Sequence, residues 1–88
     1  MSLAGGIGGA QLAGSLEGEG LAADAFVRAS VPEVATAALV SYTTQVVAGT
    51  LYRFTYAGYE GEIQVWSQSW NNGFLKITLP NGTEIANQ

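Results

Sequence analysis

Short segments that alternate between apolar and polar residues occupy the sequence after Pro32 and constrain its fold most strongly. Alternation with a period of two places one set of side chains on each face of a β-strand. Glycine-containing connectors between such segments favour tight hairpins, which join antiparallel neighbours. The predicted strands are residues 37–47, 50–56, 62–69 and 74–79, and their connectors are Ala48-Gly49, residues 58–61, Asn72-Gly73 and Asn81-Gly82. Together these features predict an antiparallel meander.

One segment before Pro32 has helical spacing instead. In residues 21–31 the apolar side chains recur at intervals of three and four, which predicts an amphipathic helix that Pro32 ends. Asp24 and Arg28 form an i,i+4 ion pair on another face, and Ser15 is a candidate N-cap. The expected apolar face consists of Leu21, Ala25, Phe26 and Ala29.

Packing this helix on the meander predicts an α+β fold, with a single α-helix on one face of a twisted antiparallel β-sheet. Tyr52, Phe54 and Tyr56 alternate along one strand and are expected beneath the helix. A chain of 88 residues is expected to form one domain, residues 1–88. Seven of its twelve glycines lie in the first twenty residues. Residues 1 to about 14 are therefore expected to form a flexible arm, with a short edge strand near 10–13.

Successive hairpins of a meander alternate between the two ends of the sheet. The turns at residues 45–49 and 67–73 are therefore expected at one end, and the turn at 57–61 at the other. The shared end is unusually apolar for hairpin tips, and exposed apolar patches usually mark binding surfaces. Gly49 is expected to supply a positive φ that β-branched residues resist. The apolar residues at the shared end are Val46, Val47, Ala48 and Trp70.

The chain contains no cysteine and no histidine, which removes several classes of site. A disulfide scaffold, a Ser/His/Asp triad, a Cys/His dyad and a zinc site with those ligands all lack their parts. Two pairs of acids, Glu17 with Glu19 and Glu60 with Glu62, lie in glycine-rich or turn segments where solvated carboxylates are expected. No nucleophile is paired with a base, so no enzyme, metal or cofactor is expected.

Charge and hydropathy exclude two kinds of partner. Three bases against seven acids give a net charge of −4, too few bases to neutralise a run of phosphates, so no nucleic acid is expected. No apolar window approaches the ~18 residues of a membrane span. The absence of cysteine and of a basic region before an apolar run favours a cytoplasmic chain. A mature secreted chain is the open alternative.

Residues 45–49 read Gln-Val-Val-Ala-Gly. This run is identical to QVVAG, the commonest form of the Q-x-V-x-G signature of the cystatin family. Residues 50–55 resemble the strand that follows the signature in plant cystatins. Residues 65–72 are similar to the plant segment V-W-x-x-P-W-x-N, which aligns Trp70 with the tryptophan of the family's second hairpin. The resemblance covers about residues 38–79 well.

The resemblance at the start of the chain is looser. Gly5-Gly6 resembles the glycine pair at the cystatin N-terminus, and Gly8-Gly9 is the alternative pair. The proline that usually precedes the second-hairpin tryptophan is Ser69 here, which does not fix φ as proline does. The absence of cysteine excludes the secreted, disulfide-bearing branch, so the chain resembles stefins and plant cystatins.

The resemblance implies a reversible, tight-binding inhibitor of papain-like cysteine proteases, or thiol protease inhibitor. The N-terminal arm and the two hairpin loops would form a wedge that blocks the active-site cleft. Leu3 and Ala4 would fill non-primed pockets, and Gly5-Gly6 would let the chain turn away from the catalytic cysteine. The implied protease-binding residues are Leu3, Ala4, Gly5, Gly6, Gln45, Val46, Val47, Ala48, Gly49, Ser69 and Trp70.

Two other interpretations come from different classes of protein. The first is a carbohydrate- or peptide-binding module that uses Tyr59, Trp66 and Trp70, which tryptophan fluorescence against oligosaccharides would test. The second is an assembly subunit that pairs through edge strands and the glycine arm. A monomer is expected from the resemblance, and a dimer that exchanges the helix and first strands is the alternative. Size-exclusion chromatography distinguishes the two states.

Overall fold

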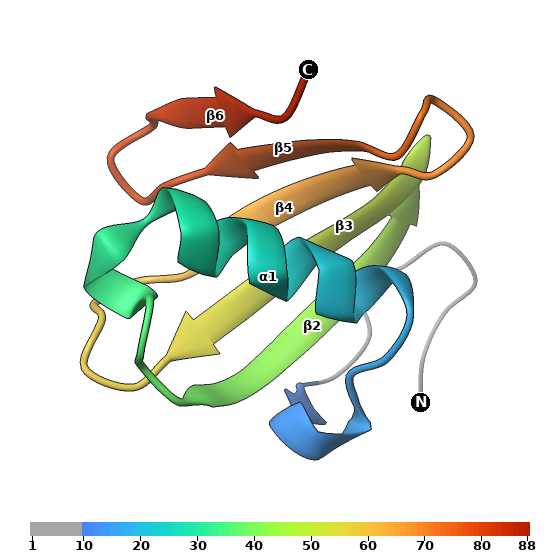
Figure 1. The fold of residues 1–88 in the computed structure, drawn as a ribbon. Helices are drawn as coiled ribbons and strands as arrows, with labels where there is room; N and C mark the ends of the chain where they lie inside the picture. The colour runs from blue at the N-terminus through green and yellow to red at the C-terminus, as the bar shows by residue number, and fades with distance from the viewer. Residues whose placement is uncertain (1–9) are drawn as a thin grey trace.

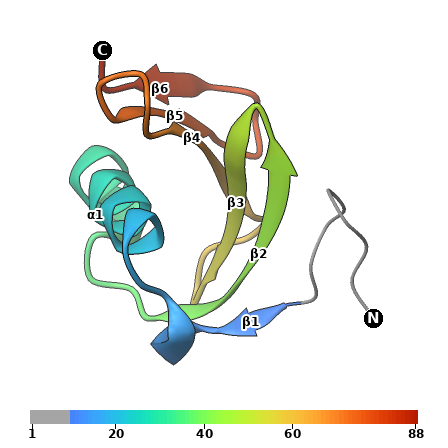
Figure 2. The same ribbon diagram turned by 90° about the vertical axis from the view of Figure 1, so that its right-hand side faces the viewer.

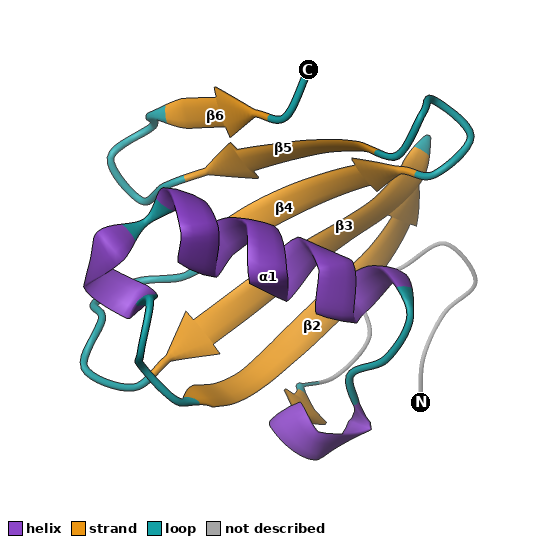
Figure 3. Ribbon diagram, viewed as in Figure 1, coloured by secondary structure: helices purple, strands orange, loops and turns teal. Residues whose placement is uncertain are grey.

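The computed structural model describes residues 10–88, which form one α-helix and a six-stranded antiparallel sheet (Figures 1 and 3). Each strand pairs with the next one along the chain, so the spatial order runs from β1 to β6. The elements are β1 (Gln11–Leu12), the 3₁₀ turn η1 (Ala13–Ser15), α1 (Glu19–Ser30), the 3₁₀ turn η2 (Pro32–Val34), β2 (Leu39–Val47), β3 (Gly49–Tyr56), β4 (Ile63–Gln68), β5 (Phe74–Thr78) and β6 (Glu84–Ala86). The predicted α+β meander is confirmed.

The core lies between α1 and the concave face of the sheet, which curves around the helix (Figure 2). Tyr52, Phe54 and Tyr56 alternate along β3 and point to this face, as the sequence predicts. Their rings lie 5.7 to 6.0 Å apart between centroids, within the range of favourable aromatic contacts. The fully buried aliphatic residues beside them include Val27, Val34, Ile63, Val65 and Ile77.

The helix presents a different face to the sheet from the one expected. Leu21 is exposed and Ala25 and Ala29 also face away, while Phe26 packs partly against the core. The residues buried along α1 are Gly20, Ala23 and Val27. A side chain at Gly20 would collide with Leu16 and press against the ring of Tyr52. Small residues therefore let the helix approach the aromatic strand, and such residues contribute little to an apolar pattern in the sequence.

The helix also begins differently from the prediction. It starts at Glu19, and its N-cap is Gly18, which has φ 57° and offers no side-chain cap. Ser15 lies in η1 and does not cap the helix. Its hydroxyl donates a hydrogen bond to the carbonyl of Leu12 at 2.8 Å and lies 2.9 Å from the hydroxyl of Tyr42. Ser15 therefore connects η1 to β2. It does not cap the helix, whose N-cap position is occupied by Gly18.

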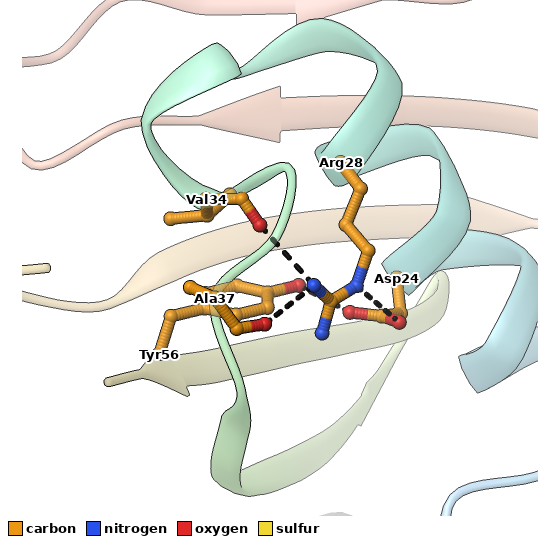
Figure 4. A network of polar contacts seen from close by, with 5 residues as sticks. All are labelled: Asp24, Arg28, Val34, Ala37 and Tyr56. Atoms are coloured by element: carbon orange, nitrogen blue, oxygen red, sulfur yellow. Dashed lines mark hydrogen bonds and ion pairs between the residues drawn. The ribbon is translucent and has the colours of Figure 1, made fainter. Parts of the chain in front are cut away.

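A polar network joins the helix to β3 and to the segment that follows the helix (Figure 4). Arg28 Nε donates to Asp24 at 3.0 Å, which confirms the predicted i,i+4 pair. The hydroxyl of Tyr56 donates to the other carboxylate oxygen of Asp24 at 2.5 Å. Arg28 Nη1 also donates to the carbonyls of Val34 at 3.2 Å and Ala37 at 2.5 Å. Burial, then the hydrogen bond to Asp24, raise the pKa of the Tyr56 hydroxyl well above its ordinary value of 10.0.

The strands agree with the alternating pattern, with two departures. Leu39 pairs with Tyr56 and Ser41 with Thr55, so Val40 is an extra residue that bulges outward and is exposed. Uninterrupted alternation would place Val40 on the same side as Tyr42. The sequence analysis also missed β6, which is only three residues long and follows a tight turn. The edge strand expected near residues 10–13 is present as β1. No helix within residues 10–88 is long and apolar enough to cross a membrane.

Candidate functional site

The structure brings two apolar hairpin tips to the same end of the sheet (Figure 1). The first tip joins β2 to β3, and the second, residues 69–73, joins β4 to β5. Val46 is 65% exposed, Val47 41% and Trp70 66%, and Ala48 is exposed between them. We call the side chains of Val46, Val47, Ala48 and Trp70 the tip surface.

The first tip is a very tight turn. Val47 pairs with Gly49, so Ala48 stands alone at the apex. Gly49 has φ 108°, a conformation that residues with a Cβ rarely adopt. A Cβ at this position would also collide with the carbonyl oxygen of Ser67 on β4. Glycine is therefore required both by the turn and by the close approach of a neighbouring strand, of which the sequence analysis predicted only the first.

Side chains of β4 hold the first tip in place. The carbonyl oxygen of Ala48 accepts a hydrogen bond from Trp66 Nε1 at 2.8 Å and a longer one from Gln68 Nε2 at 3.4 Å. The Trp66 ring meets the edge of Phe74, with centroids 6.0 Å apart, and the Lys76 amine lies 5.4 Å from its centroid. Sequence reasoning treated Trp66 as a free aromatic and missed this role. The alternation that places Trp66 on the face away from the helix was the available signal.

The register directs the two valines of the first tip to opposite faces of the sheet. Val46 pairs with Thr50, which pairs with Ser67, whose side chain is buried on the helix side. Val47 is the next residue and points to the other face, because successive side chains alternate along a strand. The tip therefore presents apolar surface on both of its sides. Gln45, two residues before Val47, lies on the outer face and is half-buried.

The second tip contains two consecutive residues with left-handed backbone. Asn72 has φ 54° and Gly73 has φ 70°. The Asn71 amide donates to the carbonyl of Gln68 at 3.0 Å, and the Gly73 amide to that of Ser69 at 3.4 Å. Trp70 projects from this loop with two-thirds of its surface exposed. These backbone bonds close the turn, while the side chains of Ser69 and Trp70 are exposed and lie outside the core.

The tip surface is electrically neutral. Residues 45–51 and 67–75 contain no aspartate, glutamate, lysine or arginine. The exposed carboxylates of Glu60 and Glu62 lie in the connection between β3 and β4, at the opposite end of the sheet. Glu19 is exposed, as expected, and its carboxylate also accepts a hydrogen bond from the buried hydroxyl of Ser67 at 3.3 Å. A partner that covers the tips therefore does not have to strip water from a charged side chain on them.

The first predicted segment of the site lies outside the described residues, namely Leu3, Ala4, Gly5 and Gly6. The described chain begins beside β2, where Gln11 pairs with Tyr42 and Leu12 with Ser41. Going backwards from Leu12 to Gln11 moves along β2 toward the first tip. This direction is the one that the wedge implied by the resemblance requires.

Comparisons of the chain with protein-family models, with curated proteins and with solved structures found no match. What the described structure defines is a compact sheet-and-helix scaffold that presents two tethered, neutral, apolar tips at one end. A protruding surface of this kind fits a concave partner rather than a small ligand.

Proposed function

We propose that this chain is a reversible, tight-binding inhibitor of papain-like cysteine proteases. The observation that carries the proposal is the tip surface, in which Val46, Val47 and Trp70 are exposed on two hairpins at the same end of the sheet. The residues of the first tip spell the signature that resembles the cystatins, and those of the second resemble the plant segment. Both sets therefore meet where a single cleft can take them.

The energetics favour inhibition by burial. Moving an exposed valine out of water contributes roughly 1.5–3 kcal/mol at full burial. Trp70 offers a larger area and few rotamers to restrict, which is typical of residues that dominate an interface. The hairpins are already held in shape, by Gly49 and by the hydrogen bonds to the Ala48 carbonyl, so docking orders little additional chain. Binding without covalent chemistry agrees with the absence of cysteine and histidine.

In this proposal Leu3 and Ala4 bind non-primed pockets of the protease, and Val46, Val47 and Ala48 occupy the middle of its cleft. Gly5-Gly6 let the chain turn away from the catalytic cysteine, so that no peptide bond is presented for attack. Trp70 anchors the primed side. The partner is thus one protease molecule per inhibitor monomer, with no nucleic acid, membrane or cofactor involved.

The test is a titration of active-site-titrated papain with the purified monomer, with trypsin as the control. The expected result is a linear loss of papain activity to an equivalence point of one to one, with trypsin unaffected. A monomer with a native circular-dichroism spectrum that leaves papain fully active would contradict the proposal. Size-exclusion chromatography on the same sample excludes an exchanged dimer as the cause of inactivity.

The geometry favours this function over the carbohydrate-binding alternative. A stacking platform needs accessible aromatic faces. Trp66 is half-buried, uses its ring nitrogen on Ala48, and is flanked by Phe74 and Lys76. Tyr59 is half-buried against the core. Among these three aromatic side chains only Trp70 is mostly exposed, which suits a single anchor in a cleft.

A further inference from the structure

The two residues that follow β6 donate three side-chain hydrogen bonds to the second tip. The amide of Asn87 donates to the carbonyl of Leu75 at 3.0 Å, and the Leu75 amide donates to Asn87 Oδ1 at 2.9 Å. Asn87 Nδ2 donates to the carbonyl of Gly73 at 3.0 Å. Gln88 Nε2 donates to the carbonyls of Asn71 at 3.1 Å and Asn72 at 2.9 Å. Three successive carbonyls of the loop are thereby bound.

These bonds meet the part of the loop that most needs support. A left-handed backbone is unfavourable for a non-glycine residue unless its surroundings hold it, although asparagine tolerates it better than most. Asn72 is such a residue, and Gln88 binds its carbonyl. Ser69, at the other side of Trp70, does not restrict its own φ as a proline would. The amides of Asn87 and Gln88 thus restrain the loop from outside.

The restraint extends from the second tip to the first. Gln88 binds the carbonyl of Asn71, and Asn71 Nδ2 donates to Gln68 Oε1 at 3.2 Å. Gln68 Nε2 in turn reaches the carbonyl of Ala48 at 3.4 Å. The side chains therefore form a continuous hydrogen-bonded path from the segment after β6, across the second tip, to the apex of the first.

We propose that Asn87 and Gln88 are positioning residues, which hold the second hairpin in the conformation that presents Trp70 to the protease. The proposal rests on the function proposed above. It names two side chains that lie outside every motif in the sequence and that do not belong to the tip surface. Their role is to lower the entropy that the loop loses on binding, so they act on affinity through Trp70.

The test uses Asn87→Ala and Gln88→Ala, singly and together, in the full chain. The matched control is Asn81→Ala. Asn81 belongs to the turn between β5 and β6, at the opposite end of the sheet, where its Oδ1 accepts a hydrogen bond from the Thr83 amide at 2.9 Å. The Asn81→Ala variant loses the same type of side chain and a comparable hydrogen bond, but leaves the second tip unaltered. Thermal unfolding of all variants establishes that each is folded.

Two measurements follow. Hydrogen exchange by NMR should be faster in the double variant at the amides of Asn71, Gly73 and Phe74, and unchanged in Asn81→Ala. Papain inhibition should weaken by about tenfold in the double variant. This is the size of effect expected when a loop must be ordered on binding without the two side chains that hold it in the free chain. The loss should appear as faster dissociation. Adding the two substitutions to Trp70→Ala should then weaken inhibition by less than about twofold, because the effect acts through Trp70.

Each outcome has a distinct reading. Unchanged exchange in the loop overturns the positioning role whatever papain does. Faster exchange with unchanged inhibition overturns it as well, as does a full tenfold loss that persists in the Trp70→Ala background. If the wild-type chain fails to inhibit papain, the proposed inhibitor function fails. The exchange measurement then still decides whether these two residues hold the loop.

Discussion

Gly49 shows how a single residue of the signature is explained by the structure. It has a positive φ, and a side chain there would collide with the backbone of Ser67 on the neighbouring strand. The positive φ is a property of the turn itself and can be predicted from the sequence. The contact with Ser67 comes from a neighbouring strand and cannot. Because even a Cβ atom would collide with the Ser67 carbonyl oxygen, we expect this position to be sensitive to alanine.

Gly49→Ala should lower the free energy of unfolding by about 2–4 kcal/mol, since backbone strain and a steric collision act together. The control is Gly82→Ala. Gly82 also has a positive φ, 90°, but has nothing within 4 Å of its missing Cβ. Urea unfolding of both variants measures the difference, which isolates the collision. Equal destabilisation of the two variants would show that the contact with Ser67 is unimportant.

Trp70→Ala should weaken papain inhibition by about 2 kcal/mol or more, a factor of roughly 30, and should leave the unfolding midpoint unchanged. The reason is that the ring is exposed in the free chain and gains its contacts only on binding. Leu21→Ala is the matched control, because Leu21 is also a large exposed apolar residue but lies on the helix. Inhibition constants for the two variants provide the measurement. An equal, small effect of both would remove Trp70 from the anchor role.

At the scale of the elements, the helix is attached to the sheet by small residues and by the network of Asp24, Arg28 and Tyr56. The Tyr56 hydroxyl has a raised pKa because it is buried and because it donates to Asp24. A raised pKa means that the folded chain keeps this proton at a pH where the unfolded chain loses it. The network therefore stabilises the fold fully below the ordinary tyrosine value and loses strength as pH rises above it.

The free energy of unfolding of the wild-type chain should thus fall as pH rises above about 10, and Tyr56→Phe should reduce the slope of that fall. Burial and nearby Glu19 raise the pKa of Tyr52 too, so part of the slope should remain. At neutral pH the substitution should cost about 1–2 kcal/mol for the bond to Asp24. Urea unfolding between pH 8 and 11 checks both statements. Identical slopes in the two proteins would count against the network.

The elements also show how far the sequence leads. The alternation of apolar and polar residues predicted four strands and the aromatic core of β3 correctly. The pattern is visible because the buried positions of these strands carry large apolar side chains at every second residue. The helix face was predicted wrongly, because Gly20 and Ala23 are buried for their small size, which an apolar count does not detect. The contacts of Asn87 and Gln88 with distant backbone carbonyls leave no local pattern, and the alternation around Trp66 indicates its face of the sheet but not its bond to Ala48.

At the scale of the whole molecule, the proposed wedge would combine the two described tips with residues 1–6, which lie outside the described residues. The described chain begins beside β2, and tracing it backward from Leu12 to Gln11 leads along β2 toward the first tip. The arm is rich in glycine, so its ordering on a protease costs entropy that its contacts must offset. The balance between the two depends on the pockets of the particular protease.

Deletion of residues 1–6 should therefore weaken inhibition of some papain-like proteases by tenfold or more, on the order of 1.4 kcal/mol, and leave others nearly unchanged. Inhibition constants for a panel of such proteases, measured with the deleted and full chains, test this. The unfolding midpoint should be the same for both chains. Equal affinity for every member of the panel would show that the arm takes no part in binding.

In the first tip, the groups that fix the backbone conformation differ from the side chains that are exposed to a partner. Ala48 is held by its carbonyl oxygen, a group that every amino acid carries, and Gly49 by its backbone. The side chains at 46, 47 and 48 project into solvent and take no part in that hold. Libraries that vary these three positions should consequently yield folded proteins with altered partners, so the molecule is suited to serve as a scaffold for displaying new binding loops.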